Sequence, residues 1–139
     1  MAITQAMCTS FKSQILGGTH DLDTHVLKIA LYTSTATLDA STTAYSATNE
    51  VSGTGYTAGG ETLAGATIAT SGTTAYVDFT DVTWPSATIT ARGALIYNTS
   101  AANAAICVLD FGEDKTSSGG NFVVTFPTAD ASNAIVRIG

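Results

Sequence analysis

Charged side chains are scarce in this chain, and basic ones are the scarcest. Asp, Glu, Lys and Arg make up 12% of the 139 residues, about half of the usual share of ~25%. Eleven acids outnumber five bases, which leaves a net charge of −6. Nucleic acids and anionic membranes are bound by clustered bases, so we expect the chain to bind neither. The dispersed bases are Lys12, Lys28, Arg92, Lys115 and Arg137.

Long hydrophobic runs are also missing. No apolar stretch approaches the roughly 18 residues that a membrane-spanning helix needs. The first residues, Met-Ala-Ile-Thr-Gln, lack the basic segment and the apolar run of a secretion signal. We therefore expect the protein to be made, and to fold, in a cytoplasm.

Only two cysteines and two histidines are available as metal ligands. Cys8 and Cys107 lie in apolar surroundings without a CxxC spacing, which predicts buried free thiols. The segment 20–25 reads His-Asp-Leu-Asp-Thr-His, and its alternate residues would share a face if the segment were extended. Zinc or calcium would need further ligands from elsewhere. We favour a polar connector here, with a metal at 20–25 as the open alternative.

Patterns of catalytic residues are absent as well. Hydroxyl groups are plentiful, but both histidines lie in one short segment and no Gly-x-Ser-x-Gly element occurs. Asp110, Glu113 and Asp114 surround a strand end, the ordinary place for solvated acids, and a hydrolase would need them to face a cleft shared with another acid. We predict no catalytic, cofactor-binding or metal-binding residues, and no enzymatic activity.

The first part of the chain has the periodicity of a helix. Apolar residues recur at spacings of three, four and seven, which indicates one helical face. These residues are Ile3, Met7, Cys8, Phe11, Ile15 and Leu16. Thr4 is a candidate N-cap, and Gly17-Gly18 would end the helix. We predict an N-terminal helical segment at 1–18, whose apolar face either covers the end of a sheet or docks on a neighbouring subunit.

From residue 26 the hydrophobic period changes to two. Segment 26–32 alternates as a half-buried strand, and 87–98 is long enough to bend at Gly93. Further strands are predicted at 63–69, 74–79, 104–111, 122–126 and 134–138, and turns at 71–72, 84–86, 98–100, 116–120 and 127–130. No helical period separates the strands. We therefore predict a single all-β domain over 1–139, an antiparallel β-sandwich or jelly-roll-like fold with its main strands in 62–139.

Residues 33–60 form a long exception to this pattern. They are rich in Thr, Ser, Ala, Tyr and Gly and have little core-forming content, which predicts an extended loop or arm. Such a segment either packs against partners or is disordered, and we favour packing. Trp84, the only tryptophan, precedes Pro85 at a strand entrance. It is expected to fill the sandwich, with a ligand platform as the alternative.

The surface composition favours burial in an assembly. Exposed Ala, Thr, Ser and Gly carry few charges that would have to be desolvated on contact with another protein. The terminal strand 133–139 would invite pairing with a neighbouring chain if it lay at a sheet edge, although it would equally fit inside its own sheet. The predicted partner interface thus combines the helix, the arm and this strand. Its candidate residues are Met7, Phe11, Tyr45, Tyr56, Ile135 and Arg137.

Four phrases of the chain resemble small virion proteins encoded among the head and tail genes of tailed bacteriophages. They are KIALYT at 28–33, NEVSGTGYTAGG at 49–60, TITARGALIY at 88–97 and FPTADASN at 126–133. The resemblance implies a structural protein of the virion that oligomerises and binds the major capsid protein or other virion proteins. Capsid decoration or cement is the first expectation; a tail, neck or fibre-base component is the second. A carbohydrate-binding fibre module, using Tyr45, Tyr56 and Trp84, is a further alternative.

Overall fold

The computed structural model describes residues 2–127, 132 and 134–138, and within them the chain is built mainly of strands. In chain order the elements are β1 (Ala6–Met7), α1 (Thr9–Leu16), β2 (Leu27–Tyr32), β3 (Glu61–Thr62), β4 (Thr67–Ser71), β5 (Thr74–Asp78), β6 (Val82–Asn98), the 3₁₀ helix η1 (Thr99–Ala101), β7 (Ala104–Val124) and β8 (Val136–Ile138). The predicted all-β fold with one short α-helix is confirmed.

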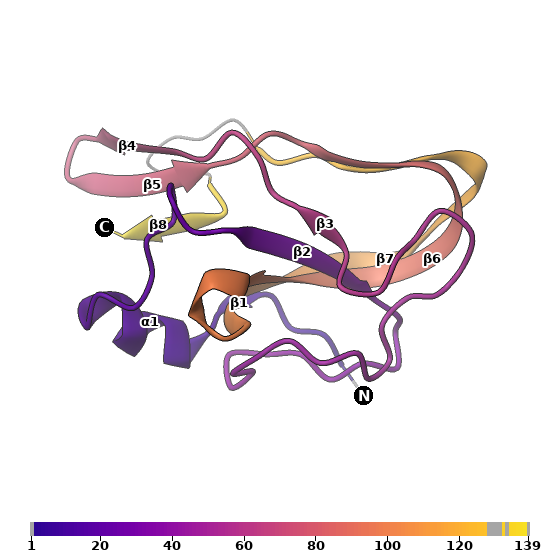
Figure 1. The fold of residues 1–139 in the computed structure, drawn as a ribbon, viewed down its shortest axis with the longest axis horizontal. Helices are drawn as coiled ribbons and strands as arrows, with labels where there is room; N and C mark the ends of the chain where they lie inside the picture. Colours follow the sequence, from indigo (N-terminus) through magenta and orange to yellow (C-terminus); the bar gives the residue numbers. More distant parts are fainter. Residues whose placement is uncertain (1, 128–131, 133, 139) are drawn as a thin grey trace.

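The strands form two antiparallel sheets. The larger sheet has the order β1-β7-β6-β2-β3, and the smaller one has the order β4-β5-β8. In Figure 1 the smaller sheet lies at the left, above the level of β2, and α1 lies below it at the same end. The molecule is therefore layered like a sandwich, with its helix and its last strand at one end.

A single long hairpin, formed by β6 and β7 of the larger sheet, bends back over itself and so contributes to both layers of the sandwich (Figure 1). Ala91 pairs with Lys115 and Gly93 with Asp110, so the single residue Arg92 lies opposite the stretch 111–114. A bulge of this kind bends a strand. Figure 1 shows the hairpin turning back at the right, so that its two halves lie in different layers. The predicted bend at Gly93 coincides with this shift in register.

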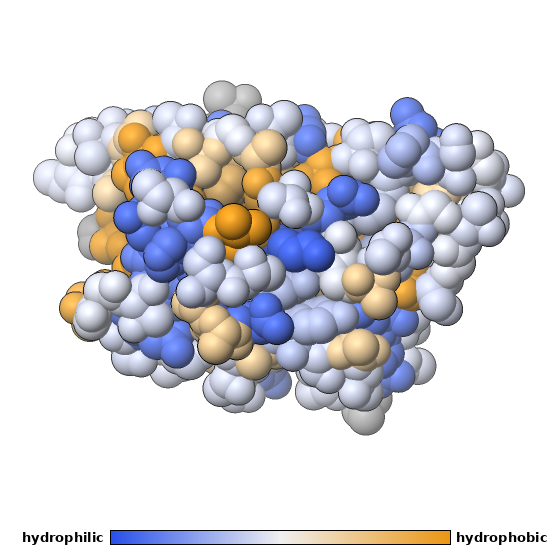
Figure 2. All heavy atoms as spheres, in the orientation of Figure 1, coloured by the Kyte–Doolittle hydropathy of each residue, from blue (hydrophilic) through white to orange (hydrophobic). Residues whose placement is uncertain are grey.

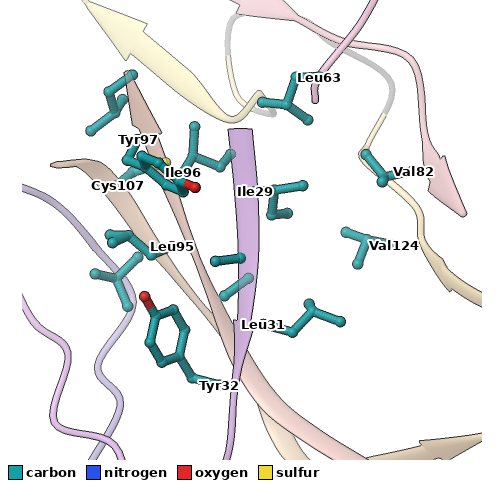
Figure 3. Packing of buried hydrophobic residues seen from close by; sticks show 14 of the residues in the cluster. Ile29, Leu31, Tyr32, Leu63, Val82, Leu95, Ile96, Tyr97, Cys107 and Val124 are labelled. Atoms are coloured by element: carbon teal, nitrogen blue, oxygen red, sulfur yellow. The ribbon is translucent and has the colours of Figure 1, made fainter. Parts of the chain in front are cut away.

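The core lies between the two halves of the hairpin and around β2. Figure 3 shows Ile29 and Leu31 of β2 pointing towards Val82 and Val124, which come from the open end of the hairpin. The opposite face of β2 carries Tyr32, which is buried beneath the segment 33–60. β2 is thus covered on both faces, although its sequence alternates like that of a half-buried strand.

Two predicted turns lie inside strands instead. Residues 84–86 belong to β6, where a register shift between Trp84 and Ala87 accommodates Pro85, which has no N–H to donate. Residues 116–120 belong to β7 and pair with β6. Their small side chains add hydrogen bonds of their own, including one from the Ser117 hydroxyl to the carbonyl oxygen of Ala87 at 2.8 Å. Pairing with a partner strand overrides the turn propensity of this stretch.

The helix is shorter than predicted. It begins at Thr9 with Cys8 as its extended N-cap, so Thr4 does not cap it. Residues before it pair instead with neighbouring segments: β1 joins β7, and Ile3 bridges Leu38. The helix ends as predicted, with Gly17 as C-cap and Gly18 at φ 77°.

The observed boundaries of the remaining segments differ from the predicted ones. Only the last part of segment 63–69, residues 67–69, lies in a strand, since β3 ends at Thr62 and β4 begins at Thr67. Residues 33–60 contain turns and isolated bridges but no strand of two or more residues. β8 occupies 136–138; residues 133 and 139 of the predicted terminal strand, and 128–130 of the predicted turn, lie outside the described residues.

Candidate interaction surface

The inner face of the smaller sheet is apolar beyond the region that the core covers. Register places Ile68 beside Val77 and Val77 beside Val136. Two residues further along the strands, on the same face, Ala75 pairs with Ile138. Val77 and Val136 are buried, whereas Ile68 is 52% exposed and Ile138 53% exposed. The sheet therefore extends an uncovered apolar margin on both sides of β5.

A groove of about 320 Å³ separates this margin from the end of α1. Ile15 and Leu22 form its opposite wall, and Leu16, the last residue of α1, is 89% exposed. Figure 2 shows hydrophobic residues gathered at the left end of the molecule, where Figure 1 places α1 and the smaller sheet. We call this feature the α1–β8 groove. Large exposed aliphatic side chains of this kind mark contact surfaces when they cluster.

A second hollow, of about 400 Å³, lies between β7 and the segment that leads into β8. Met7, Ile135 and Arg137 all line it, together with Leu109 and Phe126. The structure therefore brings three of the six predicted interface residues to one place. They come from opposite ends of the chain, which is why sequence spacing alone could not group them.

Two histidines converge on the buried side chain of Asn98 at the edge of the α1–β8 groove. The amide nitrogen of Asn98 donates to Nδ1 of His20 and to Nδ1 of His25, each at 2.9 Å. The amide oxygen accepts the N–H of Ser100 at 2.9 Å, which sets the orientation of the amide. Nε2 of His20 donates in turn to Oε1 of Gln14 at 2.8 Å. Each imidazole thus accepts through Nδ1, which requires the neutral form.

Burial and the neighbouring His25 lower the pKa of His20. Outside this cluster, a hydrogen bond between Asp21 and Asp23 lowers the pKa of Asp21 and raises that of Asp23.

No group of three or more His, Cys, Asp or Glu side chains is placed to hold a metal ion among the described residues. The segment 20–25 connects α1 to β2, and its histidines serve as hydrogen-bond acceptors for the hairpin.

The arm 33–60 is fastened to the chain's own sheet through Glu50. One carboxylate oxygen accepts the hydroxyl of Tyr45 at 2.6 Å. The other accepts the hydroxyl of Tyr56 and, at 2.8 Å, the N–H of Gly59. The Tyr56 oxygen also accepts the N–H of Leu31 in β2 at 2.9 Å. Glu50 therefore joins three points of the arm, one of which, Tyr56, is bonded to the backbone of β2.

Further tyrosines extend this attachment. The Tyr97 hydroxyl donates to the carbonyl oxygen of Gly59 at 2.6 Å, and its ring stacks on that of Tyr45 with centroids 4.7 Å apart. The Tyr32 hydroxyl donates to the carbonyl oxygen of Ser46 at 2.7 Å. Burial, with Glu50 as a further cause, raises the pKa of Tyr45 and of Tyr56. These hydroxyls stay protonated and act as donors, so the arm packs on its own domain.

Two aromatic residues expected at a partner interface or a ligand platform lie inside. Phe11 is fully buried, with its ring 5.0 Å from that of His20, because the apolar face of α1 packs against the chain's own structure. This corrects the expectation that Phe11 is available to a partner. Trp84 is 0% exposed and contacts the rings of Tyr56 and Phe122, so it fills the sandwich and is not a surface platform.

The acids near the end of the predicted strand 104–111 have ordinary partners. Asp110 accepts Nε of Arg92 at 3.2 Å, and Glu113 pairs with Lys115 at 2.9 Å. The ammonium group of Lys115 lowers the pKa of Glu113. Glu113 and Asp114 lie exposed in the bulge of β7. As predicted, these are surface acids.

Comparisons of the chain with protein-family models, with curated proteins and with solved structures found no match. Within the described part of the chain, no helix is long and apolar enough to cross a membrane. The groove, the hollow beside β8 and the fastened arm are therefore the structural features from which a function has to be inferred.

Proposed function

We propose that this chain is a non-enzymatic structural protein of a tailed-phage virion, which joins an assembled particle through protein–protein contacts. The α1–β8 groove carries the proposal, because it clusters Ile15, Ile68 and Ile138 on a surface that is otherwise poor in charge. Apolar side chains on a surface of Ser, Thr and Ala are easily desolvated by a protein partner. The resemblance to phage head and tail proteins supplies the kind of particle.

A capsid decoration or cement protein is our first choice. Such a protein must keep a fixed shape while it bridges shell subunits, and the Glu50 network gives the long arm a fixed place. The second choice is a tail, neck or fibre-base component. A carbohydrate-binding module is less well supported, since Trp84 is buried and the hydroxyls of Tyr45 and Tyr56 are occupied within the arm.

Co-sedimentation with purified phage shells and with purified tails tests the proposal. The wild-type protein should pellet with shells, and Ile138→Ser should weaken this severalfold to about tenfold, because fully burying an isoleucine side chain contributes ~1.5–3 kcal/mol and about half of this side chain is still exposed. Val123→Ser is the matched control, since Val123 is 50% exposed but does not line the groove. Retention on tails alone would replace the capsid assignment with the tail assignment. Retention on neither particle would refute the proposed function.

A further inference from the structure

One sheet edge combines length with an absence of charge. Among the described edge strands, β1 and β3 have two residues each, and β8 has three, including Arg137. The part of β7 that extends past β1 carries Glu113, Asp114 and Lys115. β4 is longer than the other three edge strands and reads Thr-Ile-Ala-Thr-Ser over 67–71. Charges, prolines and bulges are the usual protection of an edge, and β4 has none of them.

The backbone of β4 presents its free groups at two known positions. Ser71 pairs with Thr74 across a two-residue turn in which Gly72 has φ 60°, as a type II′ hairpin requires of its first turn residue. The pair that closes such a turn is hydrogen-bonded, and hydrogen-bonded pairs alternate along an antiparallel ladder. Ala69 therefore bonds to β5. The N–H and C=O groups of Ile68 and Thr70 point away from β5, towards the open edge.

We propose that a second copy of this chain pairs with β4 in antiparallel orientation, around a two-fold axis at Ala69. Ile68 of each chain then lies opposite Thr70 of the other, and each such pair exchanges two backbone hydrogen bonds. The two smaller sheets become one continuous sheet. The pairing of two copies rests on the proposed function, because it assumes that the chain works by contacts between proteins.

A second copy fits this edge for two reasons. The interface is self-complementary, because the same two residues supply donors and acceptors on both sides. The edge is also uncharged. In a chain of net charge −6, two copies therefore repel each other less at this edge than at the acidic parts of their surfaces. Pairing also places a strand on each side of Ile68, whose side chain is 52% exposed in the single chain.

Disulfide trapping tests the register directly. Two Ala69 residues would form a non-hydrogen-bonded pair with Cα atoms about 4.5 Å apart, within the range of about 4.4–6.8 Å that a disulfide spans. Under mild oxidation Ala69→Cys should therefore form a covalent dimer. Thr73→Cys, in the hairpin turn, should not, because the antiparallel arrangement separates the two turns. The native cysteines are buried and provide a common background.

Sedimentation equilibrium tests the association itself. The wild-type protein should reach twice the chain mass of 14.1 kDa as its concentration rises. Thr70→Pro removes an outward N–H but leaves the β4–β5 bonds in place, and Ile68→Lys puts a charge on the edge. Each should weaken association by about tenfold or more without changing the circular dichroism spectrum. Ile68→Lys keeps the test valid if the proline variant fails to fold.

A monomeric wild-type protein at every concentration would overturn the β4 pairing, and so would equal trapping of Ala69→Cys and Thr73→Cys. Undiminished association of Ile68→Lys would overturn it as well. Binding to particles is measured separately. A monomer that pellets with shells would refute the pairing and keep the proposed function, whereas a β4-paired dimer that binds neither shells nor tails would do the reverse.

Discussion

Replacing Glu50 should loosen the arm before it unfolds the sheets. The side chain accepts three hydrogen bonds, from the hydroxyls of Tyr45 and Tyr56 and from the N–H of Gly59. Hydrogen bonds to a charged group contribute ~1.5–3 kcal/mol each when they are well formed. The site is only partly buried, and the three bonds share one carboxylate. We therefore take about 1 kcal/mol per bond, below that range, and expect Glu50→Ala to reduce the free energy of unfolding by about 3 kcal/mol.

The isosteric change Glu50→Gln should cost less. The amide retains one acceptor oxygen, which can keep the hydroxyl of Tyr56 and the N–H of Gly59, while its NH₂ group faces the hydroxyl of Tyr45. Loss of the charge and of one acceptor should reduce stability by about 1–2 kcal/mol. Glu61→Gln makes the same chemical change on the exposed strand β3 and should stay within about 0.5 kcal/mol of wild type.

Urea denaturation measures these free energies, and limited proteolysis locates the change. No Lys or Arg occurs between Lys28 and Arg92, so trypsin cannot cut the arm, whereas chymotrypsin can cut after Tyr45 and Tyr56. The variants should become more sensitive to chymotrypsin and not to trypsin. If Glu50→Ala cost less than about 0.5 kcal/mol, or if both proteases cut the variants faster to the same degree, the reasoning would be refuted.

Three further predictions concern pH, thiols and a tight turn. Lowering the pH below about 6.5 should reduce the free energy of unfolding, because the pKa of His20 is lowered in the folded chain and the unfolded chain takes up the proton first. A free energy of unfolding that stays constant from pH 7 to 5 would contradict this. Cys8, whose pKa burial raises to about 11, and Cys107 should react with a thiol reagent only on unfolding, and rapid labelling of the native protein would show that they are accessible. Gly60→Ala should cost more than about 3 kcal/mol, since its Cβ would clash with the carbonyl oxygen of Ile29. Gly72→Ala, also at positive φ but in open space, should cost about 1 kcal/mol, and equal losses would contradict the clash.

The sequence predicted the features that depend on local pattern. The alternation in 26–32 located β2, the glycines after Leu16 located the end of α1, and the composition of 33–60 indicated a segment without strands. Each of these signals acts over a few residues. The buried thiols were predicted in the same way, from apolar neighbours.

Features that depend on distant pairing were not predictable in this way. Residues 116–120 have the composition of a turn, and only their ladder with β6 makes them a strand. The α1–β8 groove joins Ile15, Ile68 and Ile138 from three separate elements. A partial signal was present in 67–71, which contains the β-branched residues Thr67, Ile68 and Thr70. Nothing in the sequence, however, indicated that this strand would be left at an edge.

The bent hairpin has a mechanical consequence. In a sandwich made of separate strands, the layers come apart when side-chain packing yields. Here β6 and β7 pass through both layers, so the layers remain connected by two strands of backbone at the bulge opposite Arg92. Separating them would mean swinging the hairpin open about that point while the ladders on either side stay intact. Such an opening would therefore bend the backbone at residues 111–114, where Gly112, at φ 82°, is the natural pivot.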